Sequence, residues 1–177
     1  MTQSGDVLLV EDNHADIQLT KHVMAEENIA YRVHVTRDGE QALNFIFGQG
    51  QYANTTRPIF ALILLDLKLP KVNGFEVLKQ IKENPSTKAL PVVMLSSSNQ
   101  VRDVDSSYEL GANGYVQKPV NFEEFSDALR RVAEFWLGAN LTPSPALFKE
   151  RESEPPTPTG LLGTMSPDPS SRKEKKE

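Results

Sequence analysis

The stretch ALILLDLKLP, residues 61–70, joins an unbroken apolar run to a single acid, Asp66. Apolar runs without alternation are typical of strands that are covered on both faces, as in parallel sheets. A carboxylate is costly inside such a layer, so the acid has to lie where the strand leaves the sheet. The stretch therefore predicts a central parallel strand with a polar site at its carboxyl end.

Further apolar runs alternate with amphipathic stretches along the chain. Strands are expected at residues 6–10, 31–36, 61–66, 91–96 and 114–117. Capping-box patterns open three of the intervening helices, at Asp38 with Gln41, Asn73 with Glu76, and Asn121 with Glu124. Strands alternating with helices predict an α/β fold, a doubly wound parallel sheet with right-handed crossovers. Such sheets bind ligands at the carboxyl ends of their strands.

The composition divides the chain into one domain, residues 1–140, and a tail, residues 141–177. The tail is rich in proline and carries six acids and six bases, so the net charge of −5 belongs to the first 140 residues. Too few apolar side chains are present in the tail to offset the entropy lost on ordering. We expect it to be disordered, with a proline-rich docking segment as the alternative.

Charge and cysteine usage exclude several classes of protein. There are no cysteines, and no apolar stretch approaches the roughly 18 residues of a membrane span. The pI is 5.3, and no large Lys and Arg cluster precedes the C-terminus. We therefore expect a cytoplasmic protein that binds neither membranes nor nucleic acid.

Functional groups follow four of the five expected strands. Glu11 and Asp12 come after the first strand, Asp66 ends the third, Ser96 ends the fourth and Lys118 follows the fifth. Carboxylates so close repel one another unless a cation neutralises them, and an all-oxygen pocket suits Mg²⁺. A hydroxyl and an ammonium beside that ion would suit the oxygens of a phosphoryl group.

Four motifs carry a family resemblance, LLVEDN (8–13), LLDLKLPKVNG (64–74), PVVMLSSS (91–98) and GANGYVQKP (111–119). Over about residues 5–137 the chain resembles the receiver domain of two-component response regulators. The resemblance implies a flavodoxin-like fold with five helices and strand order 2-1-3-4-5. The stretches GQGQYANTTRPI (48–59), SSYELGANGY (106–115) and FWL (135–137) are similar to single-domain regulators associated with bacterial phytochromes.

The resemblance also implies roles for individual residues around a magnesium ion. Asp66 would be the phosphoacceptor, Asp12 a direct ligand of the ion, and Glu11 an acid that holds a metal-bound water. Asp66 would ligate the ion as well, and Lys68 would contribute its backbone carbonyl. Glu11 stands where Asp is commoner, but the carboxylate is kept.

Further implied roles concern the phosphoryl group. Ser96, where Thr is also frequent, would hydrogen-bond a phosphoryl oxygen, and Lys118 would pair with it. Tyr115 resembles the aromatic switch that swings inward after Ser96 moves. Pro119 would follow a cis peptide bond. Gly74 is expected to serve a turn where the backbone passes close to the acidic pocket.

The leading hypothesis is a phosphorylation switch rather than an enzyme, with only autocatalytic phosphotransfer and dephosphorylation. A sensor histidine kinase, with a bacteriophytochrome as candidate, would supply the phosphoryl group. We also expect a homodimer through the fourth helix, fifth strand and fifth helix. On the expected fifth helix, apolar residues recur every three to four positions and form a stripe, with Trp136 beside it. The stripe consists of Phe122, Phe125, Leu129, Val132 and Phe135.

Two alternatives remain open from the sequence. One is a receiver-like binding module that is never phosphorylated. The other is a hydrolase with an aspartyl-phosphate intermediate, but such enzymes usually place a second acid two residues after the nucleophile, and Lys68 occupies that position.

Overall fold

The computed structural model describes residues 5–26 and 31–144. Most of the predicted tail, residues 145–177, therefore lies outside the described residues. The described chain forms one five-stranded sheet in the order β2-β1-β3-β4-β5, and every neighbouring pair is parallel. The predicted α/β class, the doubly wound sheet and the strand order are confirmed.

The elements alternate along the chain as the sequence predicts. The strands are β1 (Asp6–Val10), β2 (Val33–Thr36), β3 (Phe60–Asp66), β4 (Val92–Ser96) and β5 (Gly114–Gln117). The helices are α1 (His14–Glu26), α2 (Gly39–Phe47), α3 (Gly74–Glu83), α4 (Val101–Glu109) and α5 (Phe122–Ala133). A short 3-10 turn, Gly50–Tyr52, follows α2, and a π-helical turn, Glu134–Ala139, continues α5.

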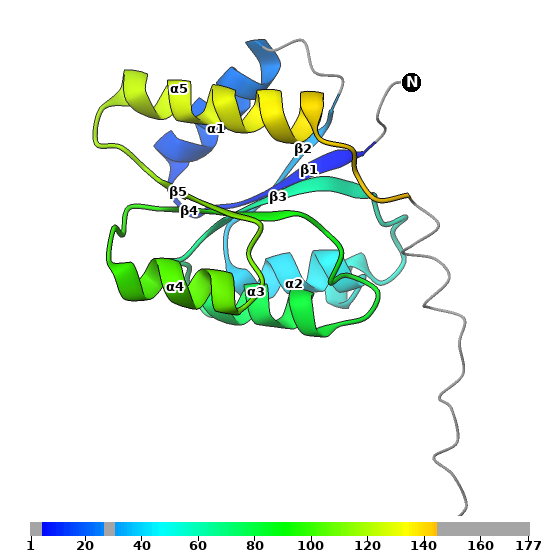
Figure 1. Cartoon of the computed structure of the whole chain (residues 1–177). Coiled ribbons are helices and arrows are strands. Elements are labelled where there is room, and N and C mark those ends of the chain that lie inside the picture. The colour runs from blue at the N-terminus through cyan, green and yellow to red at the C-terminus, as the bar shows by residue number, and fades with distance from the viewer. Residues whose placement is uncertain (1–4, 27–30, 145–177) are drawn as a thin grey trace, which may run out of the picture.

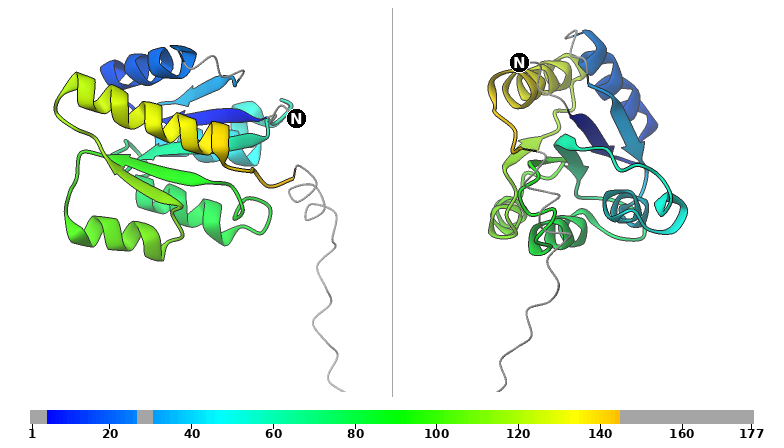
Figure 2. Two further views of the ribbon diagram at one scale, coloured as in Figure 1. Left: turned by 45° about the horizontal axis from the view of Figure 1, so that its top comes forward. Right: turned by 90° about the vertical axis from the view of Figure 1, so that its right-hand side faces the viewer.

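The sheet lies between two helical layers. Figure 1 shows α1 and α5 on one face and α2, α3 and α4 on the other, and the views in Figure 2 agree. Two apolar cores follow from this arrangement. Val7 and Leu9 of β1 face the core under α1 and α5, whereas Leu8 and Val10 face the core under the other layer. Successive side chains of a strand point to opposite faces, so the buried part of β1, Val7 to Val10, has to be apolar.

Strand β3 follows the same rule, and all seven of its residues are buried. Leu62 and Leu64 contribute to one core, and Ile63 and Leu65 to the other. Asp66 is the last residue of the strand. The acid at the end of the apolar run therefore lies where the strand leaves the sheet, as predicted.

All three predicted helix caps are present. Asp38 accepts a hydrogen bond from the Gln41 N–H, and Asn73 accepts one from the Glu76 N–H. The Asn121 side chain accepts from the backbone of two first-turn residues of α5. These bonds satisfy N–H groups that have no partner inside a helix.

Two sequence-based expectations need correction. Strand β2 begins at Val33 instead of Tyr31, because its register with β1 starts at the pair Val7 and Val33. The apolar stripe of α5 is also shorter than predicted, since Phe122 and Phe135 are exposed. Phe122 is the first residue of the helix, and Phe135 falls in the π turn, where the wider winding breaks the 3.6-residue period.

Within the two described stretches, none of the helices has the length and apolar character that a membrane crossing requires.

Candidate functional site

Three carboxylates meet at the carboxyl edge of the sheet. Glu11 and Asp12 directly follow β1, and Asp66 ends β3, the neighbouring strand. One oxygen from each lies within 4.8 Å of the others. Glu11 and Asp66 are buried and Asp12 is exposed, so the cluster is open to solvent on one side. An all-oxygen donor set of this kind fits a hard divalent cation.

The ammonium of Lys118 reaches into this cluster from the loop after β5. It donates hydrogen bonds to Glu11 Oε2, to Asp66 Oδ2 at 2.8 Å and to Asp16 Oδ2 at 3.0 Å. The Lys118 side chain is only 9% exposed. Its charge is therefore neutralised by three acids in a mostly dehydrated place, which strengthens each contact.

For both Glu11 and Lys118, burial and neighbouring charge shift the pKa in opposite directions. Burial raises the pKa of Glu11 to about 6, although the charge of Lys118 and its hydrogen bond oppose that effect. Burial by itself would lower the pKa of Lys118, but the charges of Asp66 and Glu11 outweigh it, and the pKa lies above its ordinary value. Lys118 therefore carries its charge at neutral pH.

Both oxygens of Asp66 have donors. Oδ2 accepts from Lys118, and Oδ1 accepts from the backbone N–H of Lys68 at 3.1 Å. The structure thus brings Lys68 to the site through its main chain, while its side chain is exposed. The Lys118–Pro119 peptide bond is trans, because no peptide bond in the described chain is cis. The cis bond implied by the resemblance is wrong here, and trans is the favoured isomer of most X–Pro bonds.

Ser96 ends β4 and is fully buried. Its hydroxyl accepts a hydrogen bond from the Ser98 N–H at 3.1 Å, and its carbonyl accepts one from the Lys118 N–H at 2.7 Å. Because Leu95 pairs with Asp66 across the sheet, Ser96 comes at the same edge as the acids. The four predicted strand ends thus meet, although the Ser96 hydroxyl bonds to the backbone of Ser98 rather than to Asp66.

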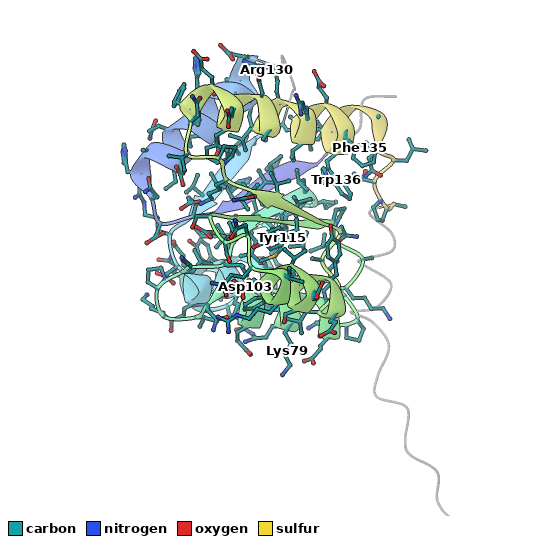
Figure 3. The ribbon with its side chains drawn as sticks, turned by 60° about the vertical axis from the view of Figure 1, so that its left-hand side comes forward. Lys79, Asp103, Tyr115, Arg130, Phe135 and Trp136 are labelled. Carbon is teal, nitrogen blue, oxygen red and sulfur yellow. The ribbon has the colours of Figure 1, made fainter. Side chains whose placement is uncertain are left out.

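Tyr115 of β5 is tied to the loop between β4 and α4. Its hydroxyl donates to the Ser98 carbonyl at 2.9 Å. The Ser98 hydroxyl in turn donates to Asp103 Oδ2 at 2.5 Å, which connects the loop to the first turn of α4. Figure 3 shows Tyr115 above α4, with Asp103 below it. The Tyr115 side chain is half-buried.

Gly74 lies where α3 starts, beside the carboxyl end of β3. A Cβ atom there would come within 2.2 Å of the Asp66 carbonyl oxygen and 2.7 Å of the Leu67 Cα. Only glycine fits at such a distance, so the predicted close approach of the backbone to the pocket is confirmed.

Two residues of this site were not predicted from the sequence. Asn13 caps α1 by accepting from the N–H groups of Ala15 and Asp16, and its own N–H donates to Glu11. Asp16 contacts Lys118 from the first turn of α1. The available signal was its spacing, since Asp16 lies four residues, about one helical turn, after Asp12.

A model of the response regulator receiver domain matches residues 7–130. Response regulator Rcp1 of Synechocystis sp. is 44% identical over 131 residues, which cover 74% of this chain and 88% of that protein. Its Mn²⁺-bound crystal structure has a TM-score of 0.75 at 41% identity and covers 79% of this chain and 99% of the other.

Two further solved structures are similar to this chain. The phosphorylated cyanobacterial phytochrome response regulator RcpA has a TM-score of 0.75 at 41% identity, covering 80% of this chain and 100% of the other. The bacteriophytochrome response regulator RtBRR has a TM-score of 0.65 at 40% identity, and the match covers 85% of this chain and 90% of the other. The similar proteins thus include regulators named for phytochromes.

Proposed function

Because the chain belongs to the response regulator receiver domain family, we propose that it is a switch that accepts a phosphoryl group on Asp66. Members of this family are phosphoacceptor signalling modules rather than conventional enzymes. A response regulator implies a cognate histidine kinase as partner. The observation that carries the proposal is the meeting of Asp66, two further acids and Lys118 at one sheet edge.

Asp66, Lys118 and Ser96 would have different roles in the phosphoryl transfer. A carboxylate oxygen of Asp66 attacks the phosphorus of a phosphohistidine, the P–N bond breaks, and an acyl phosphate forms. Lys118 already donates to Asp66 at 2.8 Å and would turn to a phosphoryl oxygen. The Ser96 hydroxyl would donate to another of these oxygens once the group is attached. Such positioned donors stabilise charge that develops during transfer.

We propose Mg²⁺ as the ion. Glu11, Asp12 and Asp66 would hold it, with the Lys68 carbonyl as a further ligand, and oxygen ligands of this kind fit Mg²⁺. When bound, the ion offsets the negative charge that gathers as the phosphoryl group approaches. A similar protein, Rcp1, has been crystallised with Mn²⁺.

We propose a bacteriophytochrome as the kinase, on the strength of the similar proteins named above. Its phosphohistidine has to reach the carboxyl edge of the sheet. Two exposed apolar side chains, Val120 and Phe122, follow Lys118 at that edge and would suit a protein partner. The cytoplasmic location, the 1–140 boundary and the disordered tail remain predictions.

We also propose a homodimer through the face formed by α4, β5 and α5. Val101 and Tyr108 of α4 and Phe135 after α5 are exposed apolar or aromatic side chains. Figure 3 shows Phe135 and Trp136 at the end of α5, on the side where Tyr115 lies between the two helices. Tyr115 would change this face when it responds to phosphorylation, which links the switch to assembly.

The test is covalent labelling by acetyl phosphate with Mg²⁺, followed by intact-mass analysis and peptide mapping. We expect one added phosphoryl group on wild type and none on Asp66→Asn. Asp105→Asn, in the exposed part of α4, is the matched control and should be labelled like wild type. Undiminished labelling of Asp66→Asn would exclude Asp66 as the acceptor, and an unlabelled wild type would favour the unphosphorylated binding module.

A further inference from the structure

Lys118 has one partner that the proposed chemistry does not use. Its ammonium donates to Asp16 at 3.0 Å, besides its bonds to Glu11 and to Asp66. An ammonium has three N–H donors, so these three carboxylates satisfy it completely.

The first turn of α1 carries Asp16 into this position. Asn13 accepts hydrogen bonds from the N–H groups of Ala15 and Asp16 and so fixes where the helix begins. An acid in the first turn is favourable at any helix N-terminus, which alone could account for Asp16. However, its side chain is only 28% exposed and points its carboxylate at Lys118 instead of at solvent.

The three partners of Lys118 differ in what else they could bind. Glu11 and Asp66 belong to the cluster whose oxygens lie within 4.8 Å of one another and could hold a cation, and Asp16 does not. A cation in that cluster would compete with Lys118 for Glu11 and Asp66. Asp16 is the carboxylate that stays available to the ammonium.

We propose that Asp16 is a positioning residue that holds Lys118 at the site while Glu11 and Asp66 are engaged by the ion and the phosphoryl group. This rests on the proposed function. Lysine carries its charge on a flexible four-carbon chain, so without a fixed partner the ammonium samples many positions. Asp16 restricts it to the place from which it can reach a phosphoryl oxygen.

The first experiment is a double-mutant cycle on the rate of labelling by acetyl phosphate at saturating Mg²⁺. We expect Asp16→Asn to slow labelling about tenfold, the factor that 1.4 kcal/mol produces. In a Lys118→Ala background the same change should have little further effect, because Asp16 acts through Lys118. Glu76→Gln removes a first-turn acid from α3 without touching Lys118, and should leave the rate unchanged.

The results separate this inference from the proposed function. If wild type is labelled and Asp16→Asn is labelled equally fast, or is slowed equally with and without Lys118, the positioning role is overturned. Should Asp16→Asn fold poorly, Asp16→Ser keeps a small polar side chain in the first turn and repeats the test.

A second measurement does not depend on labelling. The NMR signal of the Lys118 ammonium is visible only while hydrogen bonds protect it from exchange with water. We expect it to persist in wild type after Mg²⁺ is added and to vanish in Asp16→Asn. Its loss from wild type on addition of Mg²⁺ would show that Asp16 does not retain the ammonium, and would overturn the inference even if no labelling occurs.

Discussion

Glu11 shows most clearly the free-energy cost of keeping a buried carboxylate charged at this site. Its side chain is 2% exposed and holds a negative charge beside a second buried acid, Asp66. Burial raises its pKa from 4.5 to about 6, and Lys118 limits that rise. The protein therefore maintains a charge at neutral pH that its surroundings disfavour. Sites that bind cations commonly carry such a cost before the ion arrives.

This cost predicts a pH dependence of stability in the presence of a chelator. Between pH 4.5 and about 6, folded protein keeps a proton on Glu11 that the unfolded chain has released. The free energy of unfolding should therefore fall as pH rises through this window, by about 1–2 kcal/mol. Glu11→Gln has no group that titrates in this window. The free energy of unfolding of Glu11→Gln, measured with urea and compared with wild type, should therefore rise by that amount as pH rises from 4.5 to about 6.

Added Mg²⁺ supplies the control. The ion binds deprotonated carboxylates, so it should stabilise wild type more at pH 7 than at pH 5 and should do less for Glu11→Gln. A difference between wild type and Glu11→Gln that is the same from pH 4 to pH 7 would contradict the raised pKa.

At the scale of elements, the segment between β3 and α3 is held by two close backbone approaches. Gly74 opens α3 against the Asp66 carbonyl. Gly39 opens α2, and a Cβ atom there would come within 2.0 Å of the Val72 carbonyl oxygen. The segment that follows Asp66 is thus confined by the first residues of two helices. Its position, and with it that of the Lys68 N–H, is set by backbone contact.

Gly74→Ala should therefore destabilise the protein by about 2 kcal/mol or more, because backbone has to move to admit the methyl group. Labelling at Asp66 should slow as well, since the displaced atom is the Asp66 carbonyl. Chemical unfolding and the acetyl phosphate assay measure the two effects. Gly138→Ala is the matched control: a Cβ atom there meets nothing within 4 Å, and the change should be close to neutral. Equal stabilities for the two variants would refute the steric argument.

The elements also show which features sequence can reveal. Caps such as Asp38 and Asn73 bond residues three positions away, so a short pattern predicted them. Strand ends were predictable for the same reason, because an apolar run stops at Asp66. The bond from Lys118 to Asp16 spans 102 positions, and no local pattern contains it.

Strand order and helix winding were also beyond local patterns. Alternating strands and helices predict a parallel sheet, but the order 2-1-3-4-5 came from the family resemblance. The exposure of Phe135 depends on a π turn that the apolar spacing alone did not indicate. The sequence therefore predicted the site residues at the strand ends better than the contacts that arrange them.

At the scale of the whole molecule, the proposed dimer predicts a link between phosphorylation and assembly. Sedimentation with and without Mg²⁺ and a beryllofluoride phosphoryl mimic should show a dimer constant that changes by roughly 5- to 150-fold, as for a coupling of about 1–3 kcal/mol. If the face already pairs well in the unphosphorylated state, the dimer would be constitutive and phosphorylation would tune partner choice.

Phe135→Ala is the more informative variant for this test. Phe135 is 54% exposed, whereas Trp136 packs partly against the core and its removal would also weaken the fold. We expect Phe135→Ala to weaken the dimer, and Val120→Ala, an exposed apolar residue at the carboxyl edge, to leave it intact. A wild type that stays monomeric at high micromolar concentration in both states would refute the dimer.

The two outer strands of the sheet have a consequence for solubility during signalling. β2 and β5 border the sheet and contain four residues each, against seven in β3. An open strand edge can pair with another molecule and seed fibrous aggregates, and short edges restrict this. If the proposed face beside β5 is exposed and covered as partners exchange, these short edges leave little risk that an encounter there extends into a continuous intermolecular sheet.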